Sequence, residues 1–311
     1  MAIPSGNLTD TTAISNLVRT AYDQYVRMAL RSIPVMRALA DVKPVQQAMP
    51  GSSVVFSIYS DLAQAVTPLT ETSDASSVAL GNPNQIPVTL LEYGSAVTTT
   101  KKLNLTSFND VDAALADIIA YNAADSIDAV VASVLTGGTN VIYGGNATST
   151  NTIDGADTIS VKNIRAAVTE LRTNKALPRI GELYAAYLHP RQTADLRAEA
   201  GTGGFQELSK YVDRTPFVAG AVGVIEGAFV VETPRVPFAL NTNTPAVNVY
   251  KAVVAGREAL AEAMGQDIST VIGPQIDALR RYHTIGWYYF GGFARLREPA
   301  LYRIETAATN G

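Results

Sequence analysis

Residues that could serve as a nucleophile or a base are scarce in this chain. It has 311 residues, with two histidines and no cysteine. A serine or threonine nucleophile needs a base within hydrogen-bond reach, and the Gly-x-Ser-x-Gly elbow of α/β-hydrolases is missing. His189 precedes Pro190 at the end of a predicted strand. A hydrogen-bonded core or turn histidine is therefore the better interpretation for His189 and for His283, and we predict no catalytic residue.

Metal and cofactor chemistry has no better support in the sequence. Two histidines without cysteine, and without His-x-x-x-His or Glu-x-x-His spacing, do not match a zinc site. The glycine-rich stretch 136–146 follows a predicted helix and lacks the Gly-Lys-Ser/Thr of a phosphate loop, so we interpret it as a turn. Neighbouring carboxylates, Asp110 with Asp112 and Glu258 with Glu262, are interpreted as solvated surface. We predict no metal and no cofactor.

The composition restricts the class of protein. The net charge is −4, which argues against a nucleic-acid binder that works by overall charge. Charged residues make up 17% and hydrophobic residues 47%, which suits a protein that hides surface against copies of itself but also suits a secreted β-protein. No apolar run reaches the roughly 18 residues of a membrane helix. No signal peptide is evident, so we expect a cytosolic product without a membrane.

Residues 51–100 contain strand-like runs but no core of their own. The runs are 51–60 and 85–100, and the stretch between them is rich in Ser, Thr, Pro and Asn. No Lys or Arg occurs between Lys43 and Lys101. Because a loop this long is uncommon inside a compact domain, we predict a projecting hairpin that lies on a partner.

Two helices are expected to frame this hairpin. The first, over 13–40, carries Arg19, Arg27, Arg31 and Arg37, and Pro34 should kink or end it. Its arginines form either a solvated face or an arm that contacts an acidic neighbour or a polyanion. The second, over 107–136, has a broad apolar stripe, a capping box at Ser107 and a glycine stop. Four aspartates are expected off that stripe: Asp112, Asp117, Asp125 and Asp128.

The remaining elements alternate between strand and helix, which indicates a compact α/β or α+β region over about 140–260. Helices are predicted over 158–175, opened by Ser160, and over 191–200, with a turn at 201–205. Strands are predicted over 183–190, 222–234 and 247–256. The aromatic stretch 282–307 is predicted as one or two strands, in which Gly286, Gly291 and Gly292 mark bulges or close backbone approach.

This order of elements resembles the major capsid proteins of tailed phages, which share the Hong Kong 97-type fold. Six phrases resemble in particular the coat-protein family typified by coliphage N-four. They are TPLTE (67–71), TNVIYGG (139–145), YAAYLHPRQTADLR (184–197), EGAFVVETPR (226–235), VYKAVVAGREALA (249–261) and TIGWYYFGGFARL (284–296). The resemblance covers nearly the whole chain and implies an α+β fold.

The resemblance also implies a division of the chain. Residues 1–48 would be an N-terminal arm and 49–100 the extended loop, or E-loop. The peripheral domain would hold the spine helix in 101–137, the axial domain would span 138–262, and strands in 263–311 would complete both. No coiled segment precedes the arm, so we expect no fused scaffold domain, and no residue pair for covalent cross-linking is identified.

The function implied is assembly of an icosahedral shell around a double-stranded DNA genome, without catalysis. Copies would form hexamers and pentamers in the virion after assembly in the host cytoplasm. Scaffolding, portal and decoration proteins would be partners, and the inner face would contact DNA non-specifically. Two alternatives stay open: an encapsulin-like shell around a cargo enzyme, and a soluble α/β enzyme with an unrecognised site.

Two groups of residues are expected at the interface between subunits. The arm contributes its arginines at positions 19, 27, 31 and 37. Since the loop has no basic residue, we expect its acidic side chains to meet basic groups of a neighbour. The loop residues are Asp61, Pro68, Leu69, Glu71 and Asp74.

Overall fold

The structure is a computed structural model, and it describes most of the chain in several stretches. These are residues 35–44, 53–59, 61–69, 71–72, 74, 77–106, 111–200, 223–273, 279 and 281–309. Several of the predictions lie outside the described residues. They are Arg19, Arg27 and Arg31, the predicted helix up to Pro34, the cap at Ser107 and the turn at 201–205.

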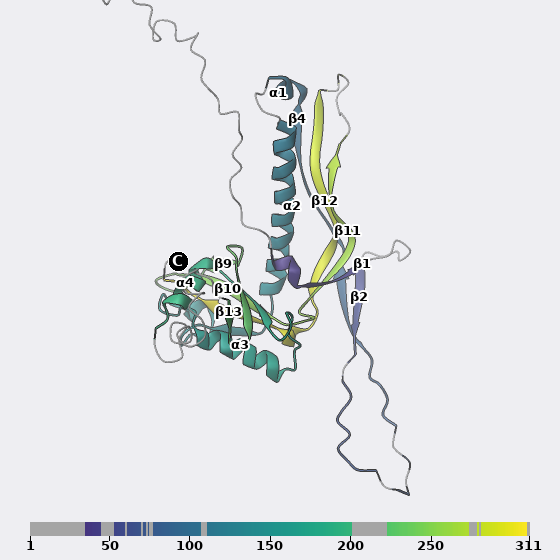
Figure 1. The fold of residues 1–311 in the computed structure, drawn as a ribbon, viewed down its shortest axis with the longest axis vertical. Coiled ribbons are helices and arrows are strands. Elements are labelled where there is room, and N and C mark those ends of the chain that lie inside the picture. Colours follow the sequence, from purple (N-terminus) through teal and green to yellow (C-terminus); the bar gives the residue numbers. More distant parts are fainter. Residues whose placement is uncertain are drawn as a thin grey trace, which may run out of the picture.

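A long four-stranded sheet forms the upper part of the molecule in the view of Figure 1. Its strand order is β1-β11-β12-β4, with β1 parallel to β11 and the other neighbours antiparallel. Residues 260–272, for which no element was predicted, form one of the central strands. The bounds are β1 Ala40–Pro44, β4 Leu91–Thr100, β11 Leu260–Ile272 and β12 Tyr282–Arg295.

Helix α2, Val111–Thr136, lies along this sheet and confirms the strongest helix prediction (Figure 1). It is preceded by the short helix α1, Lys101–Thr106. Because alternate residues of a strand face the same side, Ile285, Trp287 and Tyr289 of β12 all pack on α2. By length and composition the stretch Leu115–Thr136 would also be able to cross a membrane, but its packing on β12 is that of a core helix.

A second, seven-stranded sheet forms the compact part of the molecule. Its path is β5-β13-β10-β6-β8-β7, and β9 pairs with β10 beside that path. Both predictions of strands over 183–190 and 247–256 are confirmed. The bounds are β5 Val141–Tyr143, β6 Tyr184–Leu188, β7 Val224–Ile225, β8 Ala228–Glu232, β9 Phe238–Leu240, β10 Asn248–Ala255 and β13 Leu301–Thr306.

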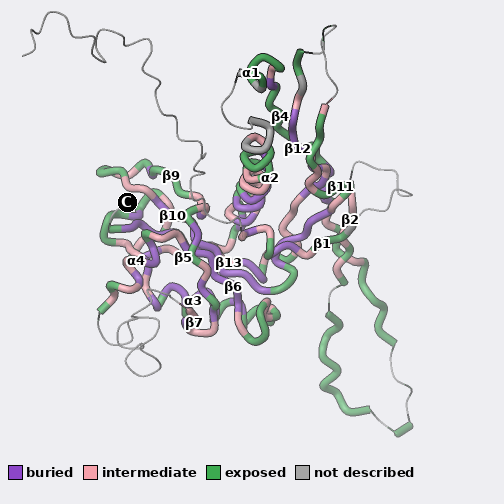
Figure 2. Tube along the Cα trace, turned by 45° about the horizontal axis from the view of Figure 1, so that its top comes forward, coloured by how far each residue is buried: buried purple, intermediate pink, exposed green. Residues whose placement is uncertain are grey.

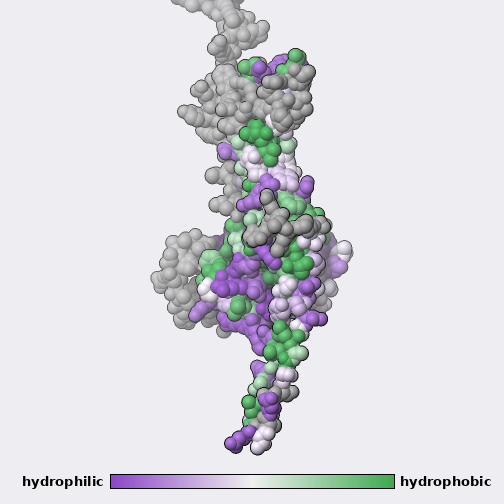
Figure 3. Space-filling view, turned by 90° about the vertical axis from the view of Figure 1, so that its right-hand side faces the viewer, coloured by the Kyte–Doolittle hydropathy of each residue, from purple (hydrophilic) through white to green (hydrophobic). Residues whose placement is uncertain are grey.

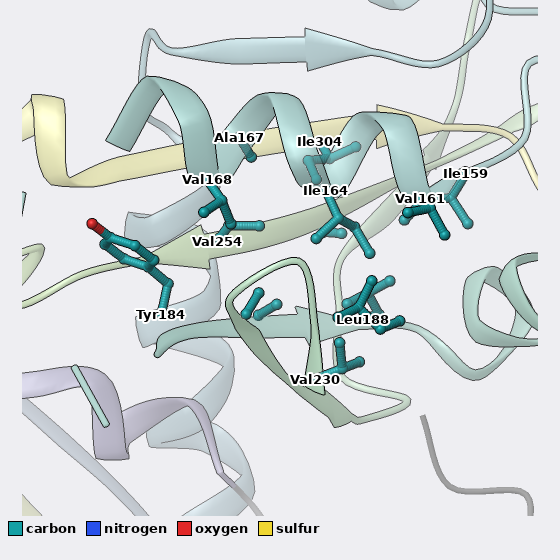
Figure 4. Packing of buried hydrophobic residues seen from close by; sticks show 14 of the residues in the cluster. Ile159, Val161, Ile164, Ala167, Val168, Tyr184, Leu188, Val230, Val254 and Ile304 are labelled. Atoms are coloured by element: carbon teal, nitrogen blue, oxygen red, sulfur yellow. The ribbon is translucent and has the colours of Figure 1, made fainter. Parts of the chain in front are cut away.

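Helices cover both faces of the seven-stranded sheet. Helix α3, Val161–Thr173, packs on one face, where Tyr184 and Leu188 meet its apolar side (Figure 4). The intervening Tyr187 points to the other face, toward the end of α2. The predicted start at Ser160 is confirmed, because a capping box closes the first turn. Helix α4, Pro190–Ala198, lies at the end of β6.

The projecting hairpin is confirmed, with one correction. Strands β2, Ser53–Ile58, and β3, Asn84–Thr89, pair antiparallel as a separate two-stranded sheet. The run 85–100 was predicted as one strand, but it divides at Leu90, and β4 belongs to the long sheet. The predicted helix over 13–40 also ends differently: Met36–Leu39 is a 3-10 turn, η2, and β1 starts at Ala40.

A carboxylate closes the connection between the two sheets. Glu298 lies in η4, Glu298–Ala300, which joins β12 to β13. Its Oε1 accepts the backbone N–H of Thr139 at 2.6 Å and its Oε2 accepts Arg295 Nε at 2.9 Å. Burial alone would raise the pKa of Glu298, but these hydrogen bonds and the charge of Arg295 lower it below its ordinary value.

Replacement Glu298→Gln should therefore reduce stability in a pH-dependent way. A lowered folded-state pKa means that the carboxylate stabilises the fold above its ordinary pKa and loses this effect as the pH falls. We expect a loss of about 1 kcal/mol near pH 7 that shrinks toward about pH 3.5. Urea unfolding at both pH values measures it, with Glu182→Gln at an exposed position as control. An equal loss at both pH values would contradict this account.

Candidate assembly interface

The hairpin extends away from the rest of the subunit and exposes apolar side chains. Beyond Ile58 and Asn84 the strands end and the described chain runs on without regular structure. Figure 2 shows this segment as exposed, and Figure 3 shows hydrophobic surface along it. Six large apolar side chains here are more than half exposed: Tyr59 60%, Leu62 57%, Val66 80%, Leu69 79%, Val78 74% and Leu80 59%.

The predicted loop residues all lie on this exposed segment. Asp61, Pro68, Leu69, Glu71 and Asp74 are each exposed, and they are spread along the hairpin beyond its paired strands. An apolar surface with scattered carboxylates and no basic residue suits a contact with a partner that is apolar and basic. Their role at an interface stays a prediction.

The one arm arginine that the structure describes, Arg37, binds carboxylates of its own chain. Its Nη2 lies 2.7 Å from Glu262 Oε1 and 3.0 Å from Asp267 Oδ1. The prediction that Glu262 is solvated is wrong, because its side chain is fully buried and also accepts the Tyr289 hydroxyl at 2.9 Å. Arg37 thus holds η2 to β11 within the subunit.

A second buried carboxylate holds the same segment from the other side. The prediction that Asp128 lies off the apolar stripe of α2 is wrong: it is fully buried. Its Oδ1 accepts the backbone N–H groups of Met36 at 2.7 Å and Arg37 at 3.1 Å, where a helical turn leaves donors unpaired. Arg235 contacts Asp125 and lies 3.9 Å from Asp128 Oδ2, which joins the compact sheet to α2.

The local electrostatics follow from burial and these partners. Burial raises the pKa of Tyr289, and the Glu262 charge raises it further, so the phenol remains a donor. Burial alone would lower the pKa of Arg37, but Glu262 and Asp267 outweigh that effect and raise it. Burial raises the pKa of Asp128, and the backbone N–H groups only partly offset this. The arrangement orders the chain and exposes no reactive group.

His189 caps a helix, in agreement with its prediction as a hydrogen-bonded core or turn histidine. His189 is the N-cap of α4, where its Nδ1 accepts the backbone N–H of Arg191 at 3.2 Å. Burial lowers its pKa, and the charge of Arg191 lowers it further. Among the described residues there is no cluster of three or more His, Asp or Glu side chains suited to a metal ion.

Comparison with known proteins identifies the family. The family described as phage capsid protein matches residues 9–308.

The chain belongs to the phage capsid protein family.

Solved capsids share the fold of this capsid protein. The cyanophage P-SCSP1u capsid has a TM-score of 0.73 and 16% identity, covering 94% of each chain. The capsid of Ralstonia phage GP4 has a TM-score of 0.73 and 16% identity, covering 94% of this chain and 96% of that one. That of Helicobacter pylori bacteriophage KHP30 has a TM-score of 0.71 and 13% identity, covering 98% and 100%. No curated protein matches in sequence.

The family and the fold together confirm the predicted class. The fold is of the Hong Kong 97 type, and the chain is a major capsid protein of a tailed phage, a structural protein of the virion. The family match favours a phage capsid over an encapsulin-like shell. The sequence did not indicate the buried cluster around Glu262 and Asp128 of the capsid protein. Their partners Arg37 and Met36 lie 225 and 92 residues away in the chain.

Removing the cation of the buried pair should destabilise the capsid protein. Replacement Arg37→Ala leaves the Glu262 carboxylate buried without its charge partner, which costs about 3 kcal/mol. Replacement Arg165→Ala breaks an exposed pair with Glu226 and should cost much less, because solvent screens an exposed ion pair. Urea unfolding of the two variants measures the difference. A small and equal loss in both would show that Glu262 does not depend on Arg37.

Proposed function

We propose that copies of this capsid protein assemble into hexamers and pentamers of an icosahedral shell around double-stranded DNA, with each hairpin lying on the next subunit. The observation that carries the proposal is the set of six exposed apolar side chains on the hairpin. No described part of the subunit covers them, and large exposed apolar patches mark interaction sites.

The architecture supports the division of the chain into assembly domains. The hairpin corresponds to most of the extended loop, 49–100, whose last strand, β4, lies in the long sheet. The long sheet with α2 corresponds to the peripheral domain, which draws on 101–137 and 263–311 and on β1 from the N-terminal arm. The seven-stranded sheet, mostly within 138–262, corresponds to the axial domain. Of the N-terminal arm, 1–48, the structure describes 35–44, which starts where the backbone N–H of Val35 donates to Asp128 Oδ2 at 3.4 Å.

A neighbouring subunit offers one surface that suits the acidic hairpin. At the other end of the molecule, α1 lies beside the start of β12, because Lys101 N–H donates to the Arg281 carbonyl at 2.7 Å (Figure 1). Lys101, Lys102 and Arg281 are exposed there, next to exposed apolar Leu103 and Leu105. A contact between opposite ends of identical copies is heterologous, and such contacts close into rings.

Further partners follow from the role of a shell subunit. We expect scaffolding, portal and decoration proteins to bind the assembling shell in the host cytoplasm, and packaged DNA to meet its inner face non-specifically. The proposal assigns the chain no catalytic step.

Electron microscopy of the expressed protein tests the proposed function. We expect rings, capsomers or closed shells, with a scaffolding partner supplied where the chain alone stays unassembled. A folded species that remains monomeric under all these conditions would contradict self-assembly.

Reversing one hairpin charge should impair assembly without affecting the fold. In Glu71→Lys the hairpin would repel the basic end of its neighbour. Each exposed pair is worth only about 0–1 kcal/mol, so the effect depends on repetition over the shell. Shell yield by electron microscopy and melting of the unassembled subunit report assembly and folding separately.

Two further variants sharpen this test. The pair Glu71→Lys with Lys102→Glu restores the opposite charges and should recover shells. The reversal Glu182→Lys, at an exposed position of the compact part, should leave shell yield unchanged. Normal shells from Glu71→Lys alone would rule out the pairing.

A further inference from the structure

The hairpin leaves the long sheet at one crossing. Strand β4 follows β12 only as far as the pair Leu91–Gly291. Past this pair β12 continues beside β11 alone, where Gly292 faces Ala263. The chain before Leu91 therefore departs from the sheet edge and passes over β12 into β3.

Gly292 of β12 lies directly under this crossing. A Cβ atom on Gly292 would be 2.0 Å from the Thr89 carbonyl oxygen and 3.1 Å from Val88 Cγ1. Non-bonded heavy atoms settle at about 3.5 Å or more. Only glycine lets the backbone of Thr89 lie this close to β12.

The neighbouring Gly291 crowds β12 from the opposite side. A Cβ there would be 2.4 Å from the Tyr289 hydroxyl and 2.8 Å from the Ala263 carbonyl oxygen. The Tyr289 ring lies over Gly291 so that its hydroxyl reaches buried Glu262. Strand β12 is thus fixed from behind, and a clash at Gly292 has to be relieved by movement of the hairpin.

One face of the hairpin is packed at the crossing and borders a cleft beyond it. Val88 and Leu90 are buried against Ala263, with Phe56 and Phe290 around them. Farther along the same face of the hairpin, a cleft of about 390 Å³ lies between Ile58, Tyr59 and Asp61 and residues 295–299. This combination is a pivot: a fixed contact with free space into which the hairpin can tilt.

We propose that Gly292, backed by Gly291, is the positioning residue that sets the direction in which the hairpin leaves the subunit. On the proposed function, this direction decides which part of the next copy the hairpin reaches. A Cβ at residue 292 would displace the Thr89 carbonyl by about 1.5 Å, and the length of the hairpin multiplies that displacement at Leu69.

Distance measurement between spin labels tests the pivot in the unassembled subunit. The chain has no cysteine, so Leu69→Cys on the hairpin and Glu170→Cys on α3 take labels specifically. Pulsed electron paramagnetic resonance should show a shifted mean distance in Gly292→Ala. Gly81→Ala is the matched control, since no atom lies within 4 Å of a Cβ on this hairpin glycine. An unchanged distance in folded Gly292→Ala overturns the proposal.

A second variant covers the case in which Gly292→Ala does not fold. Val88→Ala loosens the packed side of the crossing without adding an atom, and it should broaden the distance distribution. A distribution as narrow as that of the parent protein overturns the pivot.

The yield of closed shells then tests the role of hairpin direction separately from the proposed function. A displaced hairpin together with fewer closed shells supports both. A displaced hairpin with normal shells overturns the claim that hairpin direction selects the contact, whereas the parent protein's failure to form any shell is a failure of the proposed function.

Discussion

The need to compensate two buried carboxylates governs how this subunit is put together. Taking an ion out of water costs several kcal/mol unless charge partners and hydrogen bonds replace the water. Glu262 and Asp128 obtain these partners from one short segment, η2, and from the arginines beside it. With η2 held there, Met36 and Leu39 fill the space between α2 and the seven-stranded sheet. The position of the long sheet relative to the seven-stranded sheet therefore depends on η2, which binds Glu262 of β11 and Asp128 of α2.

Local periodicity was enough to predict the elements that fold by local rules. Helices α2 and α3 and strands β6 and β10 followed from apolar spacing and from the cap at Ser160. The glycines of β12 were predicted as points of close approach, which the structure confirms at Gly286, Gly291 and Gly292.

Features set by distant residues were not predictable from local patterns. Glu262 looks like a surface residue until Arg37, 225 positions earlier, is placed against it. Strand β11 was not predicted because its residues do not alternate between buried and exposed, and its register with β12 is interrupted around Gln266. The break at Leu90 leaves no local mark either, because the chain there passes over Gly292 of another strand. At the interface, the sequence indicates which residues are left uncovered but not what covers them.

The long antiparallel ladder between β4 and β12 has a mechanical consequence. Ten residue pairs join the two strands, from Tyr282–Thr100 to Gly291–Leu91, and the hairpin continues directly from the Gly291 end. A pull on the hairpin along its strands loads this ladder in shear, so its hydrogen bonds share the force and do not open one after another. Where hairpins join copies as proposed, outward pressure on a shell would load the ladder in this way.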